Sequence, residues 1–385
     1  MAATRAIEVR TEIPGPRSRA VLEREQHSVA RPLIVHAPVV AAEARGATIT
    51  DVDGNTFLDF VGGVGVLNVG HNHPRVVEAI HEQVDRFLHT DFTVVPYEPY
   101  VTLAERLSGL VPISGETRAA FFNAGTEAVE NAVKLARLHT GRHAVIAFEG
   151  AFHGRTLLAL TMTSRTHPYK TGLGPFAPEV YRAPYPNPYR GPDAETALAA
   201  LERMLSTHVG ADHVATIVFE PQQGEGGFIP ADPEFVRGLR RLCDEHGIVL
   251  VADEVQTGFG RTGRMFAMEH FDVEADLIVV AKSIAGGLPL SGVVGRASIM
   301  DDPHEGAIGG TFIGNPVALA AAGAVLDVFE EDRLVERAGI VGDVIRAGCS
   351  HGKSAGRRSV TCAASGRCSR SSSSTTARRR IRRRT

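Results

Sequence analysis

The chain has 385 residues, of which 43% are hydrophobic and 22% charged, a balance typical of a folded globular protein. It contains no apolar run of about 18 residues and no signal-peptide pattern at its start, so we expect a cytoplasmic protein that does not bind a membrane. Residues 347–385 carry eleven basic and no acidic side chains, which leaves residues 1–346 with a net charge of −14. This acidic body gives no reason to expect a nucleic-acid partner.

The predicted elements begin with a small hairpin over Thr48–Phe60, where Asp53-Gly54 is a turn signal. From about Arg118 onward, short apolar runs bounded by Gly, Asp, Asn or Pro alternate with helix-length segments. This alternation predicts an α/β fold with a mostly parallel sheet covered on both faces. The runs predicted as buried strands are Ala119–Phe122, Ala144–Phe148, Val214–Phe219, Ile248–Ala252, Leu277–Val280 and Gly292–Val294. The segments predicted as helices are Thr126–His139, Ala194–Leu205 and Pro233–His246.

The end of the chain divides into a helical segment and an unusual tail. Residues Asn315–Phe329 predict one long helix that runs on into Glu330–Arg337. Residues 347–385 have no helical or strand period and are rich in Ser and Arg, a composition typical of disorder. We interpret this abrupt change in composition as the result of translation in a shifted reading frame. The shift is placed between Arg337 and Ala347. A functional basic arm is the alternative interpretation.

Three predicted strands lead directly to ionisable residues, namely Glu220, Asp253 and Lys282. The carboxyl ends of parallel strands meet at one edge of a sheet, so we expect these side chains to gather there. Each has a structural alternative, because an acidic residue can simply cap a helix and a lysine can extend its amine to water. Only three of the four lysines lie before residue 347. Lys282 has apolar neighbours that disfavour its charged form, as Schiff-base formation with a carbonyl cofactor requires.

A possible phosphate site lies where Gly125 and Thr126 open the helical segment NAGTEAVENAVKLA. The unpaired N–H groups and the positive dipole end of a helix N-terminus suit a phosphate group. The alternative is that Thr126 serves only as an N-cap. His71 and His73 lack a third ligand at suitable spacing, so we expect no metal site.

Six segments follow one another along the chain, namely NAGTEAVENAVKLAR, FHGRTLLALTMT, FEPQQGEGG, ADEVQTGFGRTG, AKSIAGGLPLSGVVGR and GGTFIGNP. In this order they resemble the motif series of the class III aminotransferases, which are pyridoxal phosphate (PLP) enzymes of fold type I. The resemblance runs from about Pro32 to Arg337. It implies an N-terminal segment of a small domain over residues 1–60, a large PLP-binding domain over 61–314, the start of a C-terminal domain over 315–346, and an aberrant tail over 347–385. The rest of the C-terminal domain of the family is then largely missing.

The resemblance implies a role for individual residues at the cofactor. Lys282 matches the lysine that holds PLP and then moves a proton between the substrate carbon and the cofactor. Asp253 matches the carboxylate that pairs with the pyridine nitrogen. Thr311 matches a residue that reaches the phosphate in the neighbouring subunit, which implies a homodimer with shared active sites. The other implied cofactor residues are Gln256 at the phenolic oxygen, Val255 and Phe152 on the two ring faces, His153 beside them, and Gly125 and Thr126 at the phosphate.

The resemblance also implies a substrate class. Arg155 matches an arginine that binds a substrate carboxylate, Glu220 an acidic residue that pairs with a second arginine, and Val64 a residue that lines the pocket. The second arginine has no match in the tail. The implied reaction transfers the amino group of an ω-amino acid, with 4-aminobutyrate as the best candidate, to 2-oxoglutarate, giving succinate semialdehyde and glutamate. The alternatives are an ornithine, acetylornithine or diamine transaminase, an aminomutase, or, in another class, a catalytically impaired product that only binds PLP or a partner subunit.

Overall fold

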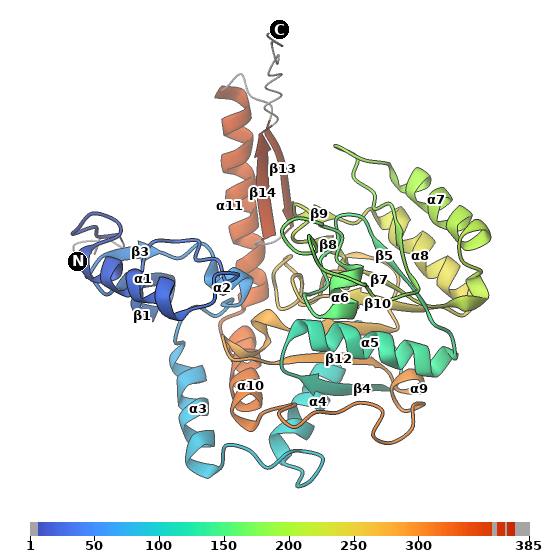
Figure 1. Cartoon of the computed structure of the whole chain (residues 1–385), viewed down its shortest axis with the longest axis horizontal. Coiled ribbons are helices and arrows are strands. Elements are labelled where there is room, and N and C mark those ends of the chain that lie inside the picture. The colour runs from blue at the N-terminus through green and yellow to red at the C-terminus, as the bar shows by residue number, and fades with distance from the viewer. Residues whose placement is uncertain (1–6, 356–359, 366–367, 374–385) are drawn as a thin grey trace.

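A seven-stranded mixed sheet forms the centre of the computed structural model, which describes residues 7–355, 360–365 and 368–373 (Figure 1). The strand order is β4-β12-β11-β10-β7-β5-β6. The pairs of β10 with β7 and β11, and of β5 with β6 and β7, are parallel, whereas β12 runs antiparallel to β4 and β11. The strands are β4 (Thr117–Phe122), β5 (Ala144–Phe148), β6 (Val180–Ala183), β7 (Val214–Phe219), β10 (Val249–Asp253), β11 (Leu277–Val280) and β12 (Ser291–Arg296). All six predicted strands are present, and β6 is an additional one at the edge.

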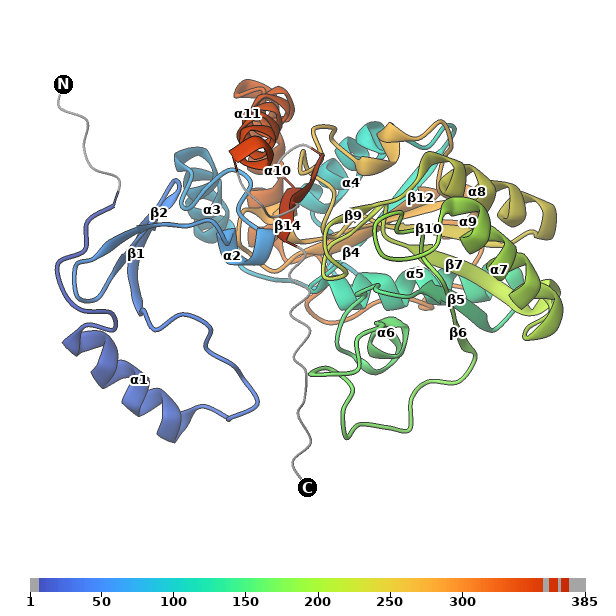
Figure 2. The same ribbon diagram turned by 90° about the horizontal axis from the view of Figure 1, so that it is seen from above.

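Helices cover both faces of this sheet, as the alternation of strands and helices predicts. Figure 2 shows α5 and α6 on one side and α4 and α8 on the other. Side chains alternate accordingly, since Val145 and Ala147 of β5 pack with α5 while Ile146 and Phe148 pack with α7 and α8. Burial of each such large side chain contributes about 1.5–3 kcal/mol. The helices are α3 (Pro74–Arg86), α4 (Glu98–Leu110), α5 (Gly125–Thr140), α6 (Leu157–Met162), α7 (Ala194–Thr207), α8 (Pro233–His246), α9 (Ala297–Met300) and α10 (Pro316–Glu331).

The N-terminal segment forms a separate small sheet that stands apart from the main one (Figure 2). The predicted hairpin is confirmed, because β2 and β3 pair antiparallel within it. Its turn is held by the Asp51 carboxylate, which accepts hydrogen bonds from the backbone N–H groups of Asp53 at 2.9 Å and Asn55 at 2.8 Å. The elements are α1 (Pro16–Ser28), β1 (Ala41–Arg45), β2 (Thr48–Asp51), β3 (Thr56–Leu58) and the short turn α2 (Gly62–Gly65). A further small hairpin joins β8 (Gln222–Gln223) and β9 (Ile229–Pro230).

The C-terminal region differs from the sequence-based expectation in two places. The long helix predicted from Asn315 is two helices, because Arg333 adopts a left-handed φ of +51° between α10 and α11 (Leu334–Ala355). Beyond it, β13 (Val360–Ser365) and β14 (Cys368–Ser373) pair antiparallel beside α11, where no regular element is predicted (Figure 1). A two-stranded hairpin needs only backbone pairing and a short connection, so it leaves no apolar period in the sequence. The predicted disorder of residues 347–385 is also wrong for residues 347–355, because α11 extends to Ala355, while residues 356–359, 366–367 and 374–385 of this tail lie outside the described residues. None of the described helices is long and apolar enough to cross a membrane.

Candidate active site

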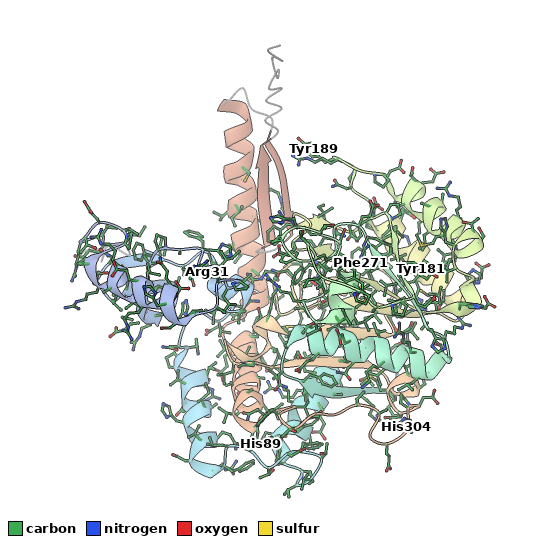
Figure 3. The ribbon with its side chains drawn as sticks, viewed as in Figure 1. Arg31, His89, Tyr181, Tyr189, Phe271 and His304 are labelled. Atoms are coloured by element: carbon green, nitrogen blue, oxygen red, sulfur yellow. The ribbon has the colours of Figure 1, made fainter. Side chains whose placement is uncertain are left out.

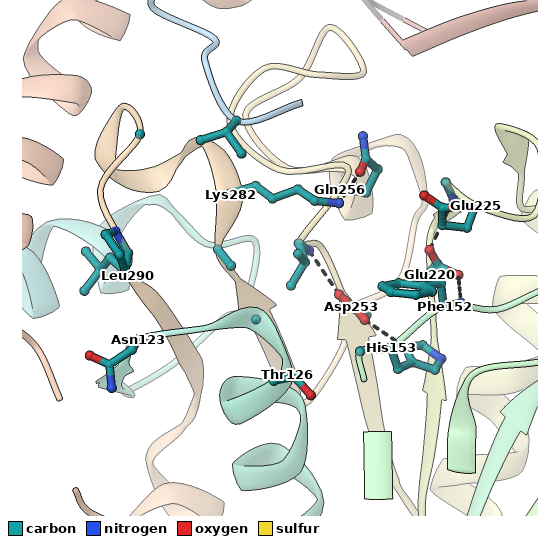
Figure 4. A pocket seen from close by; sticks show the side chains of 18 of the residues that line it. Asn123, Thr126, Phe152, His153, Glu220, Glu225, Asp253, Gln256, Lys282 and Leu290 are labelled. Atoms are coloured by element: carbon teal, nitrogen blue, oxygen red, sulfur yellow. Dashed lines mark hydrogen bonds and ion pairs between the residues drawn. The ribbon is translucent and has the colours of Figure 1, made fainter. Parts of the chain in front are cut away.

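Three neighbouring strands bring the three predicted ionisable residues into one cavity (Figure 4). Glu220 follows β7, Asp253 ends β10 and Lys282 follows β11 after one residue, and all three line a cavity of about 340 Å³. The cavity therefore lies at the carboxyl ends of parallel strands, as the sequence predicts. Its other lining residues are Val66, Asn123, Gly125, Thr126, Phe152, His153, Gly154, Gly224, Glu225, Val255, Gln256, Ala281 and Gly287–Leu290.

Lys282 presents its amine to the cavity from a strained turn. It opens a short 3₁₀ helix, Lys282–Ala285, and has a left-handed φ of +45°. Its amine donates a hydrogen bond to Oε1 of Gln256 (Figure 4). Burial lowers the pKa of this amine, although the charges of Asp253 and Glu220 partly oppose the shift. A lowered pKa increases the fraction of neutral amine, which is the nucleophilic form.

The Asp253 carboxylate is buried and hydrogen-bonded through both of its oxygens. Oδ2 lies 2.7 Å from Nδ1 of His153, and Oδ1 accepts a hydrogen bond from the backbone N–H of Val255 at 3.1 Å. Burial alone disfavours the charged form of His153, but the hydrogen bond and the charge of Asp253 outweigh it, so the pKa of His153 is raised. No described residue bonds Nε2 of His153, which is also buried. The pair thus holds a carboxylate in a fixed orientation at the edge of the cavity.

Glu220 is buried close to Phe152 (Figure 4). Its oxygens accept hydrogen bonds from the backbone N–H groups of Phe152 at 3.1 Å and Gly224 at 3.2 Å. Burial, together with the charge of Asp253, raises the pKa of Glu220 to about 7. Sequence reasoning missed Glu225, an exposed residue that also lines the cavity. The segment FEPQQGEGG carries both acids, but only Glu220 directly follows the predicted strand, so the strand pattern gives no signal for Glu225.

The N-terminus of α5 reaches the cavity at Gly125 and Thr126. A Cβ atom added at Gly125 would lie 3.2 Å from Cγ1 of Val255 and 3.4 Å from Cβ of Ala281, so a side chain there would crowd this part of the cavity. Thr126 Oγ1 lies 2.5 Å from Thr156 Oγ1. The structure therefore leaves backbone rather than side chain at the positive end of the helix, which suits a bound anion.

Three of the predicted site residues do not line the cavity. Val64 is 63% exposed in the short turn α2, and Val66 lines the cavity instead. Arg155 is exposed, and its guanidinium carbon lies 4.6 Å from the centroid of the Tyr169 ring. Thr311 is exposed in the turn before α10. The remaining predicted site residues all line the cavity.

The two histidines considered as metal ligands have other contacts. Nε2 of His71 lies 2.7 Å from Oδ2 of Asp59, and Nε2 of His73 lies 3.8 Å from Oδ2 of Asp332. In the described part of the chain, no three or more His, Cys, Asp or Glu side chains are grouped so that they could hold a metal ion.

Comparison with known proteins identifies the family. A sequence model described as aminotransferase class-III matches residues 31–358. The chain belongs to the class III aminotransferases. It is 50% identical over 339 residues to a 4-aminobutyrate aminotransferase of Mycobacterium tuberculosis, a match that covers 85% of this chain and 76% of that protein. It is 46% identical over 331 residues to a 5-aminovalerate aminotransferase of Pseudomonas putida, covering 86% of this chain and 78% of that protein.

Solved structures support the same assignment. A taurine:2-oxoglutarate aminotransferase from Bifidobacterium kashiwanohense, in complex with PLP and glutamate, matches with a TM-score of 0.86 at 29% identity, covering 94% of this chain and 82% of that one. The ornithine aminotransferase of Toxoplasma gondii matches with a TM-score of 0.79 at 30% identity, covering 91% and 80%. The family and these structures identify an aminotransferase of the PLP-dependent α/β fold, with PLP as its cofactor.

Proposed function

We propose that this aminotransferase is an ω-amino acid transaminase that transfers the amino group of 4-aminobutyrate to 2-oxoglutarate, giving succinate semialdehyde and glutamate. The observation that carries the proposal is the meeting of the Lys282 amine and the Asp253 carboxylate in one cavity, in a chain 50% identical to a 4-aminobutyrate aminotransferase. The 46% identity to a 5-aminovalerate aminotransferase supports the same substrate class. Both names describe an amine at the end of a chain that carries a carboxylate. We also propose that the protein acts in the cytoplasm.

The residues present in the cavity fit PLP. The cofactor has an aldehyde, a basic ring nitrogen, an apolar ring and a phosphate. Lys282 supplies the amine for the aldehyde, and Asp253 supplies a buried carboxylate for the protonated nitrogen. Phe152 and Val255 offer apolar surfaces to the ring, and the start of α5 at Gly125 offers backbone N–H groups to the phosphate. Gln256 lies next to the amine and is our candidate for the phenolic oxygen.

When bound, PLP supplies an electron-withdrawing ring that stabilises negative charge on the substrate carbon. The task of Asp253 is to keep a proton on the ring nitrogen, and its hydrogen bonds from His153 and Val255 hold it in place for this. Lys282 would hold the cofactor through its amine, and its Nζ would accept a proton from the substrate carbon. Its lowered pKa favours the neutral amine that can do so. The overall reaction exchanges an amino group for a carbonyl oxygen between two substrates, so it needs no external oxidant.

We further propose that the enzyme is a homodimer in which Thr311 contributes to the partner's phosphate site. Thr311 is exposed and is not among the residues that line the cavity of its own chain. Large apolar side chains are exposed nearby in the chain and in other loops, including Phe312 at 63% and Phe60 at 93%. Exposed apolar groups of this size are typical of protein interfaces. A two-fold dimer is the commonest arrangement that covers such a surface.

A coupled assay tests the proposed reaction directly. The purified chain, supplied with PLP, should form glutamate and succinate semialdehyde from 4-aminobutyrate and 2-oxoglutarate. Lys282→Ala should abolish the reaction, whereas Lys134→Ala, at an exposed lysine of α5, should leave it unchanged. If the chain binds PLP but forms no glutamate from either 4-aminobutyrate or 5-aminovalerate, the proposed substrate class is wrong.

A further inference from the structure

Tyr169 contacts three residues of the candidate site. Its ring packs edge-on against Phe152, with centroids 5.3 Å apart and an interplanar angle of 62°. The guanidinium carbon of Arg155 lies 4.6 Å from the centroid of the same ring. The Tyr169 hydroxyl donates a hydrogen bond to Oε2 of Glu225 at 3.4 Å. Phe152 and Glu225 line the cavity, whereas Arg155 does not, so Tyr169 connects Arg155 to the cavity wall.

The two charged groups meet different parts of the tyrosine for a physical reason. The face of an aromatic ring carries partial negative charge and attracts a guanidinium, whereas the hydroxyl at the ring edge donates to a carboxylate. Tyr169 therefore contacts Arg155 and Glu225 through separate sites. In the described part of the chain, no carboxylate forms an ion pair with Arg155. The planar set of N–H donors on this arginine is thus available to a ligand carboxylate.

We propose that Tyr169 is a positioning residue that sets the preference of this enzyme for amino donors with a carboxylate. Its ring holds the guanidinium of Arg155 beside the cavity, where that guanidinium binds the carboxylate of the donor. The hydrogen bond from Tyr169 holds Glu225 at the cavity wall, away from the ring face that Arg155 occupies. The inference rests on the proposed function, which requires a donor with a carboxylate, and on the resemblance of Arg155 to the arginine that binds this carboxylate.

A steady-state experiment on the holoenzyme separates this role from a general effect on the site. Tyr169→Leu removes the ring face and should raise KM for 4-aminobutyrate about fivefold, the factor expected for one cation–π contact. Its kcat should change less than its KM. With n-butylamine, a donor that has no carboxylate, KM should not change. Tyr169→Phe keeps the ring face, so its KM for 4-aminobutyrate should stay close to that of the unchanged enzyme.

A binding experiment tests whether Tyr169 acts through Arg155. Butyrate has the carboxylate but no amine, so calorimetry can measure its affinity for the holoenzyme without turnover. Tyr169→Leu should weaken butyrate binding about fivefold, and in an Arg155→Gln background the same change should have no further effect. Tyr181→Leu is the matched control, since Tyr181 also donates to a glutamate, Glu179, at 3.0 Å, but lies on the edge strand β6 outside the cavity lining (Figure 3). Its butyrate affinity should equal that of the unchanged chain.

The outcomes distinguish this inference from the proposed function. Additive effects of Tyr169→Leu and Arg155→Gln would overturn the inference, as would an unchanged butyrate affinity in Tyr169→Leu. A complete lack of butyrate binding by the unchanged holoenzyme would also overturn it, because Arg155 would then bind no carboxylate. The proposed function fails on a different result, namely a holoenzyme that binds butyrate but transfers no amino group.

Discussion

Glu254, which directly follows Asp253, makes the stability of the fold dependent on pH. Its side chain is buried, with 0% exposure. Its oxygens accept hydrogen bonds from the backbone N–H groups of Ala267 at 2.9 Å and Met268 at 2.8 Å, and from the Thr257 hydroxyl. Burial nevertheless raises the pKa of Glu254 from 4.5 to about 7. The folded chain therefore retains a proton on Glu254 over a pH range in which the unfolded chain has lost it.

This difference fixes the sign of the pH effect. Where the folded state binds more protons than the unfolded state, the free energy of unfolding falls as the pH rises. For Glu254 the stabilisation is complete below its unfolded pKa of 4.5 and is lost as the pH rises through the folded value of about 7. Between pH 5 and pH 8, the linkage relation gives a loss of about 2.5 kcal/mol from this one group.

Urea unfolding of Glu254→Gln, measured without PLP at both pH values, tests this reasoning. The amide is neutral throughout, so the variant should gain about 2–3 kcal/mol relative to the unchanged chain between pH 5 and pH 8. Any constant loss from the changed hydrogen-bond geometry cancels in this comparison. Glu245→Gln, at an exposed position of α8, should show no such gain. A difference between Glu254→Gln and the unchanged chain that stays the same at both pH values would refute the reasoning.

Three further predictions follow from the site, the core and the surface. Asp253→Asn should lower kcat for 4-aminobutyrate by about 100-fold or more, with an unchanged circular dichroism spectrum, because the ring nitrogen loses its charged partner; a loss below tenfold would argue against this role. Phe219→Ala should reduce the free energy of unfolding by about 3–5 kcal/mol in urea titrations, because the Phe219 ring is fully buried in β7 and its removal leaves a cavity. A loss below 1 kcal/mol would contradict its place in the core. Light scattering should report a dimer for the unchanged chain. Phe312→Asp should increase the monomer fraction, because it places a charge on an exposed apolar surface that we propose as part of the interface. A monomeric unchanged chain would exclude the dimer.

The central strands could be predicted because both of their faces are buried. β5 and β7 are near-continuous apolar runs with a polar residue directly before and after them, so the sequence predicts both their length and their position. The gathering of Asp253 and Lys282 at one edge then follows from the parallel arrangement alone. The edge strand β6 was missed because its sequence, VYRA, is short and only its last residue is buried.

Some features of the site could not be predicted from the sequence, because they depend on the direction and burial of individual side chains. Arg155 belongs to a recognisable motif, but nothing in the motif shows that its guanidinium lies over Tyr169, outside the cavity lining. Glu220 was predicted because it directly follows β7, whereas Glu225 lies in an exposed turn, and no strand pattern indicates that it also lines the cavity. Contacts between segments far apart in the chain fix these differences, and no local pattern encodes them.

The identity of the lysine that binds the cofactor is the most direct test of the central claim. The chain loaded with PLP should be reduced with borohydride, digested and analysed by mass spectrometry. Lys282 lines the cavity beside Asp253 with an amine whose pKa burial lowers, so we predict that the cofactor is fixed to Lys282. Cofactor fixed to Lys134 or Lys170, with Lys282 unmodified, would contradict the account.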